Sequence, residues 1–533
     1  MDATHAPRPV GAPLSELFRT CRVTGFAVFT PVQRLVLTHA VAAVSFLAFG
    51  GILALLIALT RWEAVSLLPP DLYYRFVSTH GTVMLVFWIV FFEIGVLLFG
   101  STVLINARLK GVRFAWTYTV MMLVGAVVAT VAHLAGLADN MFTAYPPLLN
   151  HPIWYAGILL FAVGALGGAC HFVYNVWTAR REGVLTGPLP LVVYALLTAA
   201  IIAIWTLLHG AVAYVPALLQ SLGWITVDPA VYRSLFWGFG HGAQQINLAA
   251  MVAAWYALAA LTVGARPVNE GLSRFAFVLY LLGINMGSMH HLLVDPGIGM
   301  HARIINTSYF MYAALLGSLI HAFSVPAAIE TAQRARGFTN GLFGWLRNGP
   351  WREPGFAALM WSFIGFGFIA GVSGVLMGTM QLNMLIHNNM FVVGHFHATV
   401  VLGTTMAFMG LSYYVVPLIL KRDLALLPLA RIQPYLYGSG LLILIFSMMA
   451  SGKLGAARRT ADVSTSLSPL PVESLSSTLM TLANTGIGIG AIVAVAGGGA
   501  YVLIMLATVL AGRRSETPNV GRLGIVAGND GPR

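Results

Sequence analysis

Long runs of apolar residues alternate with short polar segments along almost the whole chain. About twelve of these runs are long enough to cross a lipid bilayer, whose hydrocarbon core is about 30 Å thick. Runs of this kind form helices in a bilayer, because a helix satisfies its backbone hydrogen bonds without water. The pattern therefore predicts an all-α fold, a polytopic bundle of about 12 transmembrane helices. The runs cover residues 35–59, 76–106, 114–137, 153–179, 189–217, 234–264, 272–291, 306–331, 356–380, 388–420, 433–451 and 483–512.

The composition supports a membrane protein. Of the 533 residues, 58% are hydrophobic and only 9% are charged, whereas soluble proteins carry about 25% charged residues. No long linker, low-complexity tract or internal repeat divides the apolar runs. We therefore expect one membrane domain over residues 31–512, with a cytoplasmic segment at 1–30 and a cytoplasmic tail at 513–533.

The basic residues are distributed unevenly between the two sets of loops. The chain has 29 Lys and Arg and a formal net charge of +12. Because cytoplasmic loops carry the excess of Lys and Arg, this asymmetry places both termini in the cytoplasm and explains the positive charge without nucleic acid. Only seven basic residues fall in loops on the outer side, namely Arg61, Arg75, Arg233, Arg303, Lys453, Arg458 and Arg459.

Six of the fifteen histidines fall at one depth, toward the outer face. Polar side chains inside a membrane are costly and usually functional, so this layer is the strongest candidate for chemistry. Five other histidines are interpreted as hydrogen-bonded structural residues. The layer contains His80, His241, His290, His291, His395 and His397, and the structural set contains His39, His133, His171, His209 and His321.

Spacing separates the six histidines into roles. His395 and His397 point about 200° apart on a helix, so they cannot share one metal ion, but each can ligate a planar cofactor on its own side. Adjacent His290 and His291 can converge on one ion if their helix ends there, as the following "DPG" indicates. With His241 they form a three-imidazole set, which suits copper or zinc better than magnesium or calcium.

These segments closely resemble catalytic subunit I of the haem–copper oxidase superfamily, over about residues 30–510. The resemblance rests on the His80 segment, the spacing from His241 to the "HH" pair, and "GHFH". The stretches "YPPLLNHPIWYAG", "HHLLVDPGIG" and "GLFGWLRNGPW" are most similar to the B-type, or ba-type, oxidases. The resemblance implies an enzyme in a bacterial or archaeal cytoplasmic membrane.

The resemblance also implies two haems and one copper ion. His80 and His397 correspond to the axial ligands of a low-spin haem, and His395 to the ligand of a high-spin haem. The three-histidine set corresponds to the ligands of the adjacent copper. Four further positions match the haem-propionate region of the family: Arg458, Arg459, His387 and Asn383. Asn383 departs from the pattern, since B-type oxidases usually carry an aspartate there.

Gln245 marks the main departure from the oxygen-reducing members of the family. Those members carry a tyrosine one helical turn after the first copper histidine, linked covalently to a copper ligand. Reduction of O₂ needs four electrons, one of which that tyrosine supplies, and a glutamine cannot be oxidised in this way. Reduction of two NO to N₂O and water needs only two electrons. The chain therefore resembles the NO reductases derived from B-type oxidases, and glutamate-containing NO reductases with non-haem iron fit less well.

The roles of three residues around the copper set remain open. Gln244 and Gln245 can donate hydrogen bonds to bound NO, or they can bond each other or water. Tyr280 lies on the seventh span and is the alternative redox-active tyrosine, although it is ten residues before His290.

Proton transfer has few candidates. Tyr256 and Ser318 are the polar residues that persist where B-type oxidases conduct protons. Glu93 is the carboxylate well inside a span, and it is either a proton relay or a neutral structural acid.

Three other functions are compatible with parts of the pattern. The first is a terminal oxidase of the cytochrome c oxidase type that reduces O₂ to water. The second is a haem sensor or electron-transfer protein without turnover, and the third is a transporter. The copper set disfavours the sensor, and "GHFH" disfavours the transporter.

The electron donor must be another protein. Cys21 and Cys170 belong to no CxxC or CxxCH motif, so neither a copper-binding cysteine pair nor a c-type haem is expected in this chain. Electrons therefore arrive from a second subunit with a dinuclear copper centre, or from a cytochrome c.

Overall fold

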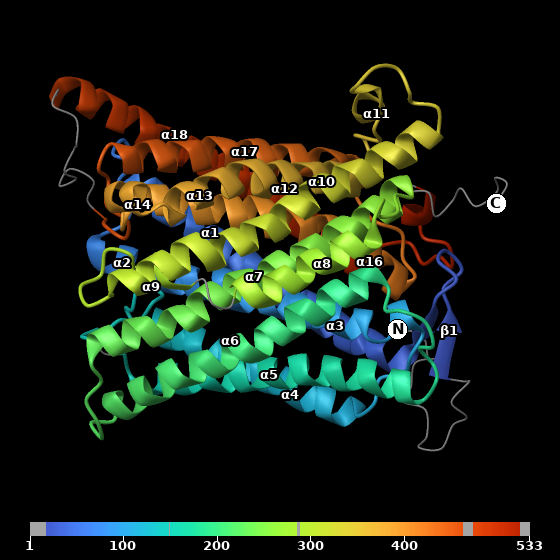
Figure 1. Ribbon diagram of the computed structural model, residues 1–533, viewed down its shortest axis with the longest axis horizontal. Coiled ribbons are helices and arrows are strands. Elements are labelled where there is room, and N and C mark those ends of the chain that lie inside the picture. Colours follow the sequence, from blue (N-terminus) through green and yellow to red (C-terminus); the bar gives the residue numbers. More distant parts are fainter. Residues whose placement is uncertain (1–16, 149, 285–287, 462–472, 523–533) are drawn as a thin grey trace.

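The computed structural model describes residues 17–148, 150–284, 288–461 and 473–522. Its helices run nearly parallel to the long axis of the molecule (Figure 1). Within the described residues, 11 helical segments are long and apolar enough to cross a membrane. The all-α polytopic fold is thereby confirmed. The segments are Thr30–Arg61, Pro70–Ile105, Val112–Leu134, Pro152–Arg181, Leu191–Ser221, Pro229–Val263, Met300–Ala335, Pro354–Gly378, Met390–Leu420, Leu427–Lys453 and Ser477–Ala511.

Several spans combine α-helix with π-helical turns. The first six spans contain α1 (Thr30–Arg61), α2 (Pro70–Thr82), η3 (Val83–Phe87), α3 (Trp88–Gly100), η4 (Val103–Ile105), α4 (Val112–Leu134), α5 (Pro152–Arg181), α6 (Leu191–Ser221) and α7 (Pro229–Val263). The later part contains α9 (Met300–Ile304), η7 (Ile305–Phe310), α10 (Met311–Ala335), α11 (Gly344–Arg347), α12 (Pro354–Phe363), η8 (Ile364–Ala370), α13 (Gly371–Gly378), α14 (Met380–Ile386), α15 (Met390–Phe396), η9 (His397–Thr405), α16 (Met406–Leu420), α17 (Leu427–Lys453), α18 (Glu473–Ala511) and η10 (Asn519–Arg522).

The twelfth expected span, at residues 272–291, is not among the eleven. The described chain forms α8 (Glu270–Leu279) and continues as the π-helix η5 (Tyr280–Ile284). Residues 285–287 of the prediction lie outside the described residues. The 3₁₀ helix η6 (Ser288–Leu292) follows, and a turn closes when the Asp295 N–H donates to the Leu292 carbonyl over 2.9 Å. The helix therefore ends at the histidine pair, as the sequence predicted.

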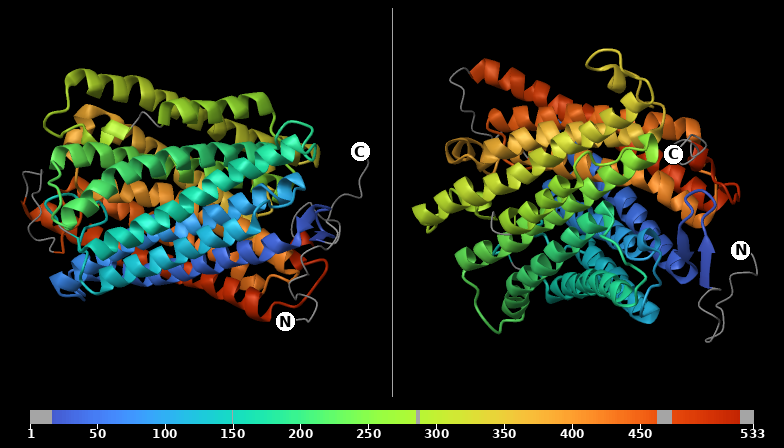
Figure 2. Two further views of the ribbon diagram at one scale, coloured as in Figure 1. Left: turned by 90° about the horizontal axis from the view of Figure 1, so that it is seen from below. Right: turned by 45° about the vertical axis from the view of Figure 1, so that its right-hand side comes forward.

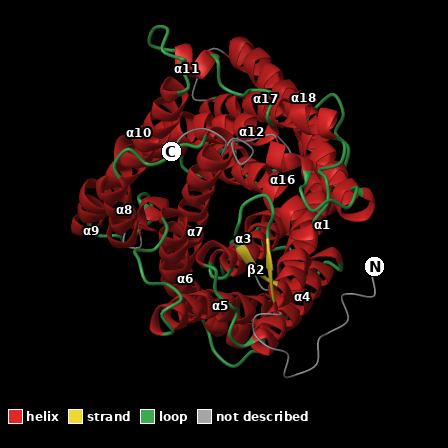
Figure 3. Cartoon of the chain, turned by 90° about the vertical axis from the view of Figure 1, so that its right-hand side faces the viewer, coloured by secondary structure: helices red, strands yellow, loops and turns green. Residues whose placement is uncertain are grey.

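The spans differ in how deeply they are buried. The most apolar windows of α7 and of Met390–Leu420 are 78% buried, whereas those of α1 and of Met300–Ala335 are 28% buried. Seen along the helices, α3, α7 and α16 lie toward the middle and α4, α5, α10 and α18 lie around them (Figure 3). The inner helices are thus the ones that can enclose cofactors.

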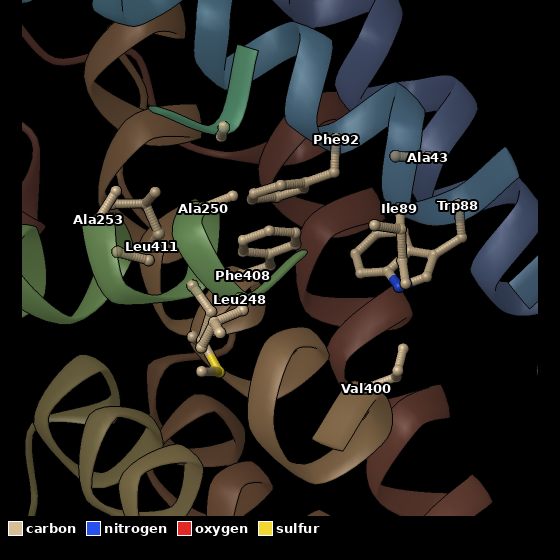
Figure 4. Packing of buried hydrophobic residues seen from close by; sticks show 14 of the residues in the cluster. Ala43, Trp88, Ile89, Phe92, Leu248, Ala250, Ala253, Val400, Phe408 and Leu411 are labelled. Carbon is tan, nitrogen blue, oxygen red and sulfur yellow. The ribbon is translucent and has the colours of Figure 1, made fainter. Parts of the chain in front are cut away.

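Aromatic and small residues hold the inner helices together. Phe92 of α3 stacks on Phe408 of α16, with ring centroids 4.3 Å apart and planes 12° apart. Leu248 and Ala250 of α7 lie beside this pair (Figure 4). Stacked aromatic pairs add to the free energy gained by burying their area, so this contact helps to hold α3 against α16, with α7 beside them.

The two described ends of the chain lie at the same end of the bundle. The strands β1 (Phe18–Thr20) and β2 (Ala27–Phe29) form a short antiparallel ribbon there (Figures 1 and 2). Arg19 donates to the carbonyls of Leu418 and Ile419, and Lys421 pairs with Glu516 over 2.9 Å. This arrangement agrees with both termini lying on the same side of the membrane. That this side is the cytoplasm stays a prediction. The three-part domain division also stays a prediction.

Candidate metal and haem site

Three imidazoles converge where α7 faces η6. Asp228 caps the start of α7, because its carboxylate accepts hydrogen bonds from the N–H groups of Ala230 and Val231, and this cap fixes the beginning of the helix that carries His241. Nitrogen atoms of His241, His290 and His291 lie within 4.8 Å of one another. His241 Nδ1 and His291 Nε2 are 3.4 Å apart. The three residues predicted to hold copper are therefore together, and their chemistry fits that metal.

Trp237 supports this set, and the sequence analysis did not single it out. Its ring stacks on His291, with centroids 3.7 Å apart and planes 6° apart. Trp237 lies one helical turn before His241, in the tryptophan-containing turn "SLFWGFG". That spacing was the signal that could have identified it, because residues at i and i+4 share a helix face.

Gln245 contacts His241, one turn away on the same face of α7. Its side-chain amide lies 3.1 Å from His241 Nε2. Gln244 makes a different contact, since its amide oxygen accepts a hydrogen bond from Asn247 over 3.4 Å. Both glutamines line the same cavity as the three histidines. The two side chains are thus not bonded to each other, which was one of the open interpretations.

His395 belongs to the same cavity as the copper set. It is near the end of α15 and its ring lines the cavity with His241, His290 and His291. Its Nδ1 atom lies 2.9 Å from the hydroxyl of Ser373. A histidine bonded at Nδ1 presents Nε2 as its metal ligand, so His395 fits the role of a haem-iron ligand.

His80 on α2 and His397 at the start of η9 are oriented in a similar way. Nδ1 of His80 lies 3.0 Å from the Gly50 carbonyl, and Nδ1 of His397 lies 2.8 Å from the Val393 carbonyl. The two imidazoles are close enough to interact electrostatically. Each keeps Nε2 for iron, so the pair fits two axial positions of one haem.

Gly50 makes the His80 contact possible. A Cβ atom at this position would lie 2.4 Å from the sulfur of Met84. A larger residue would have to displace the Met84 side chain for α1 and the second span to approach this closely. The glycine thus leaves room for the contact between its carbonyl and His80.

Two arginines lie beside the histidines without an anionic partner. Within the described residues, no carboxylate forms an ion pair with Arg458 or Arg459, whereas Arg233 pairs with Asp295 over 2.7 Å. Burial, and then the charge of Arg459, lowers the pKa of Arg458 to about 9. Arg61 of α1 holds their loop through the carbonyl oxygens of Thr460 and Ala457. Charges in this setting need an anion, and the propionates of a haem fit that need.

Asn383 on α14 and His387, which caps the end of that helix, flank the same region. Burial, and then the charge of Arg458, lowers the pKa of His387. The amide of Asn383 donates to the Met377 carbonyl over 2.6 Å and reaches the carbonyl of His290 at 3.5 Å. Its buried Oδ1 has no hydrogen-bond partner within the described residues. Asn383 thus connects α14 to the histidine pair.

A cavity of about 250 Å³ extends from the histidines into the bundle. Tyr280 and Ser318 line it, and their hydroxyl oxygens are 3.1 Å apart. His321 also lines it, and His321 Nδ1 is 3.0 Å from the hydroxyl of Tyr256. The Tyr256 hydroxyl in turn donates to Ser273 over 2.9 Å. The cavity wall therefore carries polar side chains in addition to the predicted metal ligands.

His321 differs from the other four histidines interpreted as structural. Those four are hydrogen-bonded as expected: His39 to Thr119, His133 to the Ala138 carbonyl, His171 to the Lys110 carbonyl and His209 to the Trp205 carbonyl. His321 is also hydrogen-bonded, to the Tyr256 hydroxyl, but it lines the cavity, and its buried Nε2 has no partner within the described residues. The sequence analysis missed this because helix periodicity alone does not show which face meets the cavity.

Glu93 lies apart from the histidine cavity. It lines a separate small void of about 40 Å³ between α3, α5, α6 and α7, together with Ile246 and Ala250. Its Oε1 atom is buried and has no partner within the described residues. The two interpretations of Glu93, proton relay and neutral structural acid, both remain predictions.

Comparison with known proteins decides the family. Residues 34–517 match the family model described as cytochrome c and quinol oxidase polypeptide I. The chain belongs to this family. The membership confirms the resemblance to haem–copper oxidase subunit I, and it makes the chain a catalytic subunit of a haem–copper oxidoreductase in a membrane.

The similar proteins are all named as oxidases. Cytochrome c oxidase subunit 1 of Thermus thermophilus is 30% identical over 397 residues, which are 73% of this chain and 69% of the relative. The subunit of the same name from Synechocystis is 24% identical over 443 residues, covering 78% of this chain and 74% of the relative. The solved structure of a haem–copper terminal oxidase dimer matches with a TM-score of 0.84 and 26% identity, over 91% of this chain and 85% of that one.

Family membership implies haem and copper cofactors, a second subunit and an electron donor. The residues described above fit such cofactors: three convergent imidazoles, three further histidines with Nε2 as the available nitrogen, and an arginine pair that needs an anion.

Proposed function

We propose that this protein reduces two NO to N₂O and water. The observation that carries the proposal is Gln245, which occupies the position one turn after His241 and contacts that histidine over 3.1 Å. A side chain there that cannot be oxidised leaves the site without a local source of a fourth electron. Reduction of two NO consumes two electrons and two protons, and needs no such source.

The cofactors would occupy the six histidines. His80 and His397 would hold the low-spin haem, His395 the high-spin haem, and His241, His290 and His291 one copper ion. When bound, the high-spin haem and the copper would supply the electrons at the point where the two NO molecules meet. Arg458, Arg459 and His387 would bind haem propionates, and Asn383 would hold α14 against the carbonyl of His290.

Gln245 would act on His241 rather than on the substrate. A histidine that coordinates metal through Nδ1 carries its hydrogen on Nε2. Turned with its amide oxygen toward His241, Gln245 accepts that hydrogen and fixes the ring. Gln244 lines the cavity and remains the side chain that can donate a hydrogen bond to bound NO.

Replacement of Gln245 by leucine tests this role. Loss of a partner that orients a metal-bound histidine typically costs about 10–100-fold in metal affinity or activity. We expect Gln245→Leu to weaken copper binding and to slow NO reduction by factors in this range, measured by copper titration and by N₂O production. Gln245→Glu keeps an acceptor for the Nε2 hydrogen and should retain copper. Equal copper affinity in the leucine variant and the native protein would refute the role.

Protons would reach the site along the polar side chains of the cavity. Ser318 and Tyr280 are hydrogen-bonded to each other, and His321 and Tyr256 form a second bonded pair. These pairs lie on α7, α10 and the α8–η5 segment, which surround the cavity. Glu93 would serve a separate route if it acts as a relay, since it lines a different void.

Replacement of His321 by phenylalanine tests the proton route. Phenylalanine keeps the ring volume but removes the nitrogen that contacts Tyr256 and the nitrogen that lacks a partner. We expect NO turnover to fall roughly 100-fold, the low end for loss of a positioned proton-transfer group, and the solvent deuterium isotope effect to rise. His39→Phe removes a histidine between α1 and α4 and should leave both quantities unchanged. Native turnover in His321→Phe would exclude His321 from the route.

Reduction of O₂ to water is the second candidate, and the names of the relatives favour it. In that case Tyr280 would supply the fourth electron, since its ring lies at the cavity wall. The electron donor in either case would be a second subunit with a dinuclear copper centre or a cytochrome c. Turnover of the purified, reduced protein with each gas separates the two candidates.

A further inference from the structure

Ser373 distinguishes His395 from the other two histidines that would bind haem iron. Nδ1 of His80 and Nδ1 of His397 each contact a backbone carbonyl. Nδ1 of His395 contacts a side-chain hydroxyl instead, at 2.9 Å from Ser373 Oγ. Of the three contacts, this is the one whose strength depends directly on a side chain.

The hydrogen of the Ser373 hydroxyl is already committed. Ser373 Oγ lies 2.6 Å from the Ile369 carbonyl and 3.2 Å from the Ala370 carbonyl, at the end of η8. A hydroxyl has one hydrogen to donate and can accept through its lone pairs. With that hydrogen directed to Ile369, the oxygen must accept a hydrogen from His395 Nδ1. His395 is then protonated at Nδ1 and has its lone pair on Nε2.

The surroundings hold this geometry in place. Ser373 is buried in α13, with 4% of its surface exposed. The next residue is Gly374, where a Cβ atom would lie 3.2 Å from His395 Cε1. The glycine leaves room for the edge of the ring, while the serine bonds its Nδ1. The two neighbouring residues thus fix both the rotation and the tautomer of His395.

We propose that Ser373 is the positioning residue that sets how strongly His395 donates electrons to the high-spin haem iron. This inference rests on the proposed function for the assignment of His395 as an iron ligand. An acceptor at Nδ1 makes an imidazole a stronger ligand through Nε2. A hydroxyl that itself donates to a carbonyl is a polarised acceptor, yet it carries no charge, so its effect is weaker than that of a carboxylate.

Ser373→Ala removes the hydroxyl that accepts from His395 Nδ1 and changes the side-chain volume very little. We expect the iron–histidine stretching band of the ferrous, substrate-free protein to shift to lower frequency in resonance Raman spectra. The midpoint potential of the high-spin haem should become more positive, because a weaker ligand stabilises ferric iron less. Ser373→Thr keeps the hydroxyl and should restore both values. The spectrum of the low-spin haem should be native in both variants, which shows that they fold.

The outcomes separate this inference from the proposed function. An unshifted band and potential in Ser373→Ala would overturn the role of Ser373 and leave NO reduction untouched. Absence of any iron–histidine band in the native protein would remove His395 as an iron ligand, and with it both this inference and the haem assignment. A shift in Ser373→Ala that Ser373→Thr does not reverse would also overturn the role, because loss of the hydroxyl would not be the cause.

Discussion

Replacement of His291 by alanine is expected to leave the protein without copper and without NO reduction. Nitrogen atoms of the three imidazoles lie within 4.8 Å of one another, and His291 Nε2 is 3.4 Å from His241 Nδ1. Two remaining ligands do not complete the set. Loss of a supporting partner costs up to about 100-fold, so loss of a ligand should cost more. Copper per protein and N₂O production measure the two effects.

The His291 experiment has a matched control. His171→Phe also removes a histidine. His171 lies on α5, where it bonds the Lys110 carbonyl, and it does not line the cavity. Its copper content and turnover should be native, and the haem content of both variants should be native. Full copper occupancy in His291→Ala would show that the metal is held elsewhere.

Replacement of His397 by alanine is expected to remove the low-spin haem and to stop electron delivery. His397 and His80 are the imidazoles that fit the two axial positions, and His397 is held by the Val393 carbonyl of its own helix. Optical and electron paramagnetic resonance spectra should lose the low-spin signal. Turnover driven by the external donor should fall below detection, since electrons no longer reach the site.

His397→Met separates loss of a ligand from loss of structure. Methionine is also an axial ligand of haem iron, and it raises the reduction potential. We expect this variant to keep a low-spin signal with a more positive potential. A normal low-spin spectrum in His397→Ala would contradict the assignment of His397 to this haem.

The sequence predicted the bundle because the bilayer alone sets the length and apolarity that a transmembrane segment needs, and both can be read from the sequence. Eleven of the twelve expected spans appear as long helices. In the run at 272–291 the described chain is helical over Glu270–Ile284 and again over Ser288–Leu292, and residues 285–287 lie outside the described residues. Hydropathy measures apolarity, so it could not show which spans contain π-helical turns or that a 3₁₀ helix carries the histidine pair.

The metal-site residues could be predicted because histidine is rare and costly inside a membrane, so its spacing carries information. The supporting residues could not be predicted in the same way. Ser373 and His321 have types that also occur throughout ordinary cores, and their importance comes from contacts between helices far apart in the sequence, whereas Trp237 had a signal in its spacing from His241. Asn383 and Arg458 were found through family resemblance rather than through their own pattern.

The most direct test of the account is turnover of the purified, reduced protein with NO and, separately, with O₂. N₂O production and O₂ uptake are followed with the same electron donor. The account predicts fast N₂O formation and slow O₂ uptake, because Gln245 cannot supply a fourth electron. Rapid reduction of O₂ to water would contradict it and would identify the protein as a terminal oxidase whose redox-active residue lies elsewhere, with Tyr280 the first to examine.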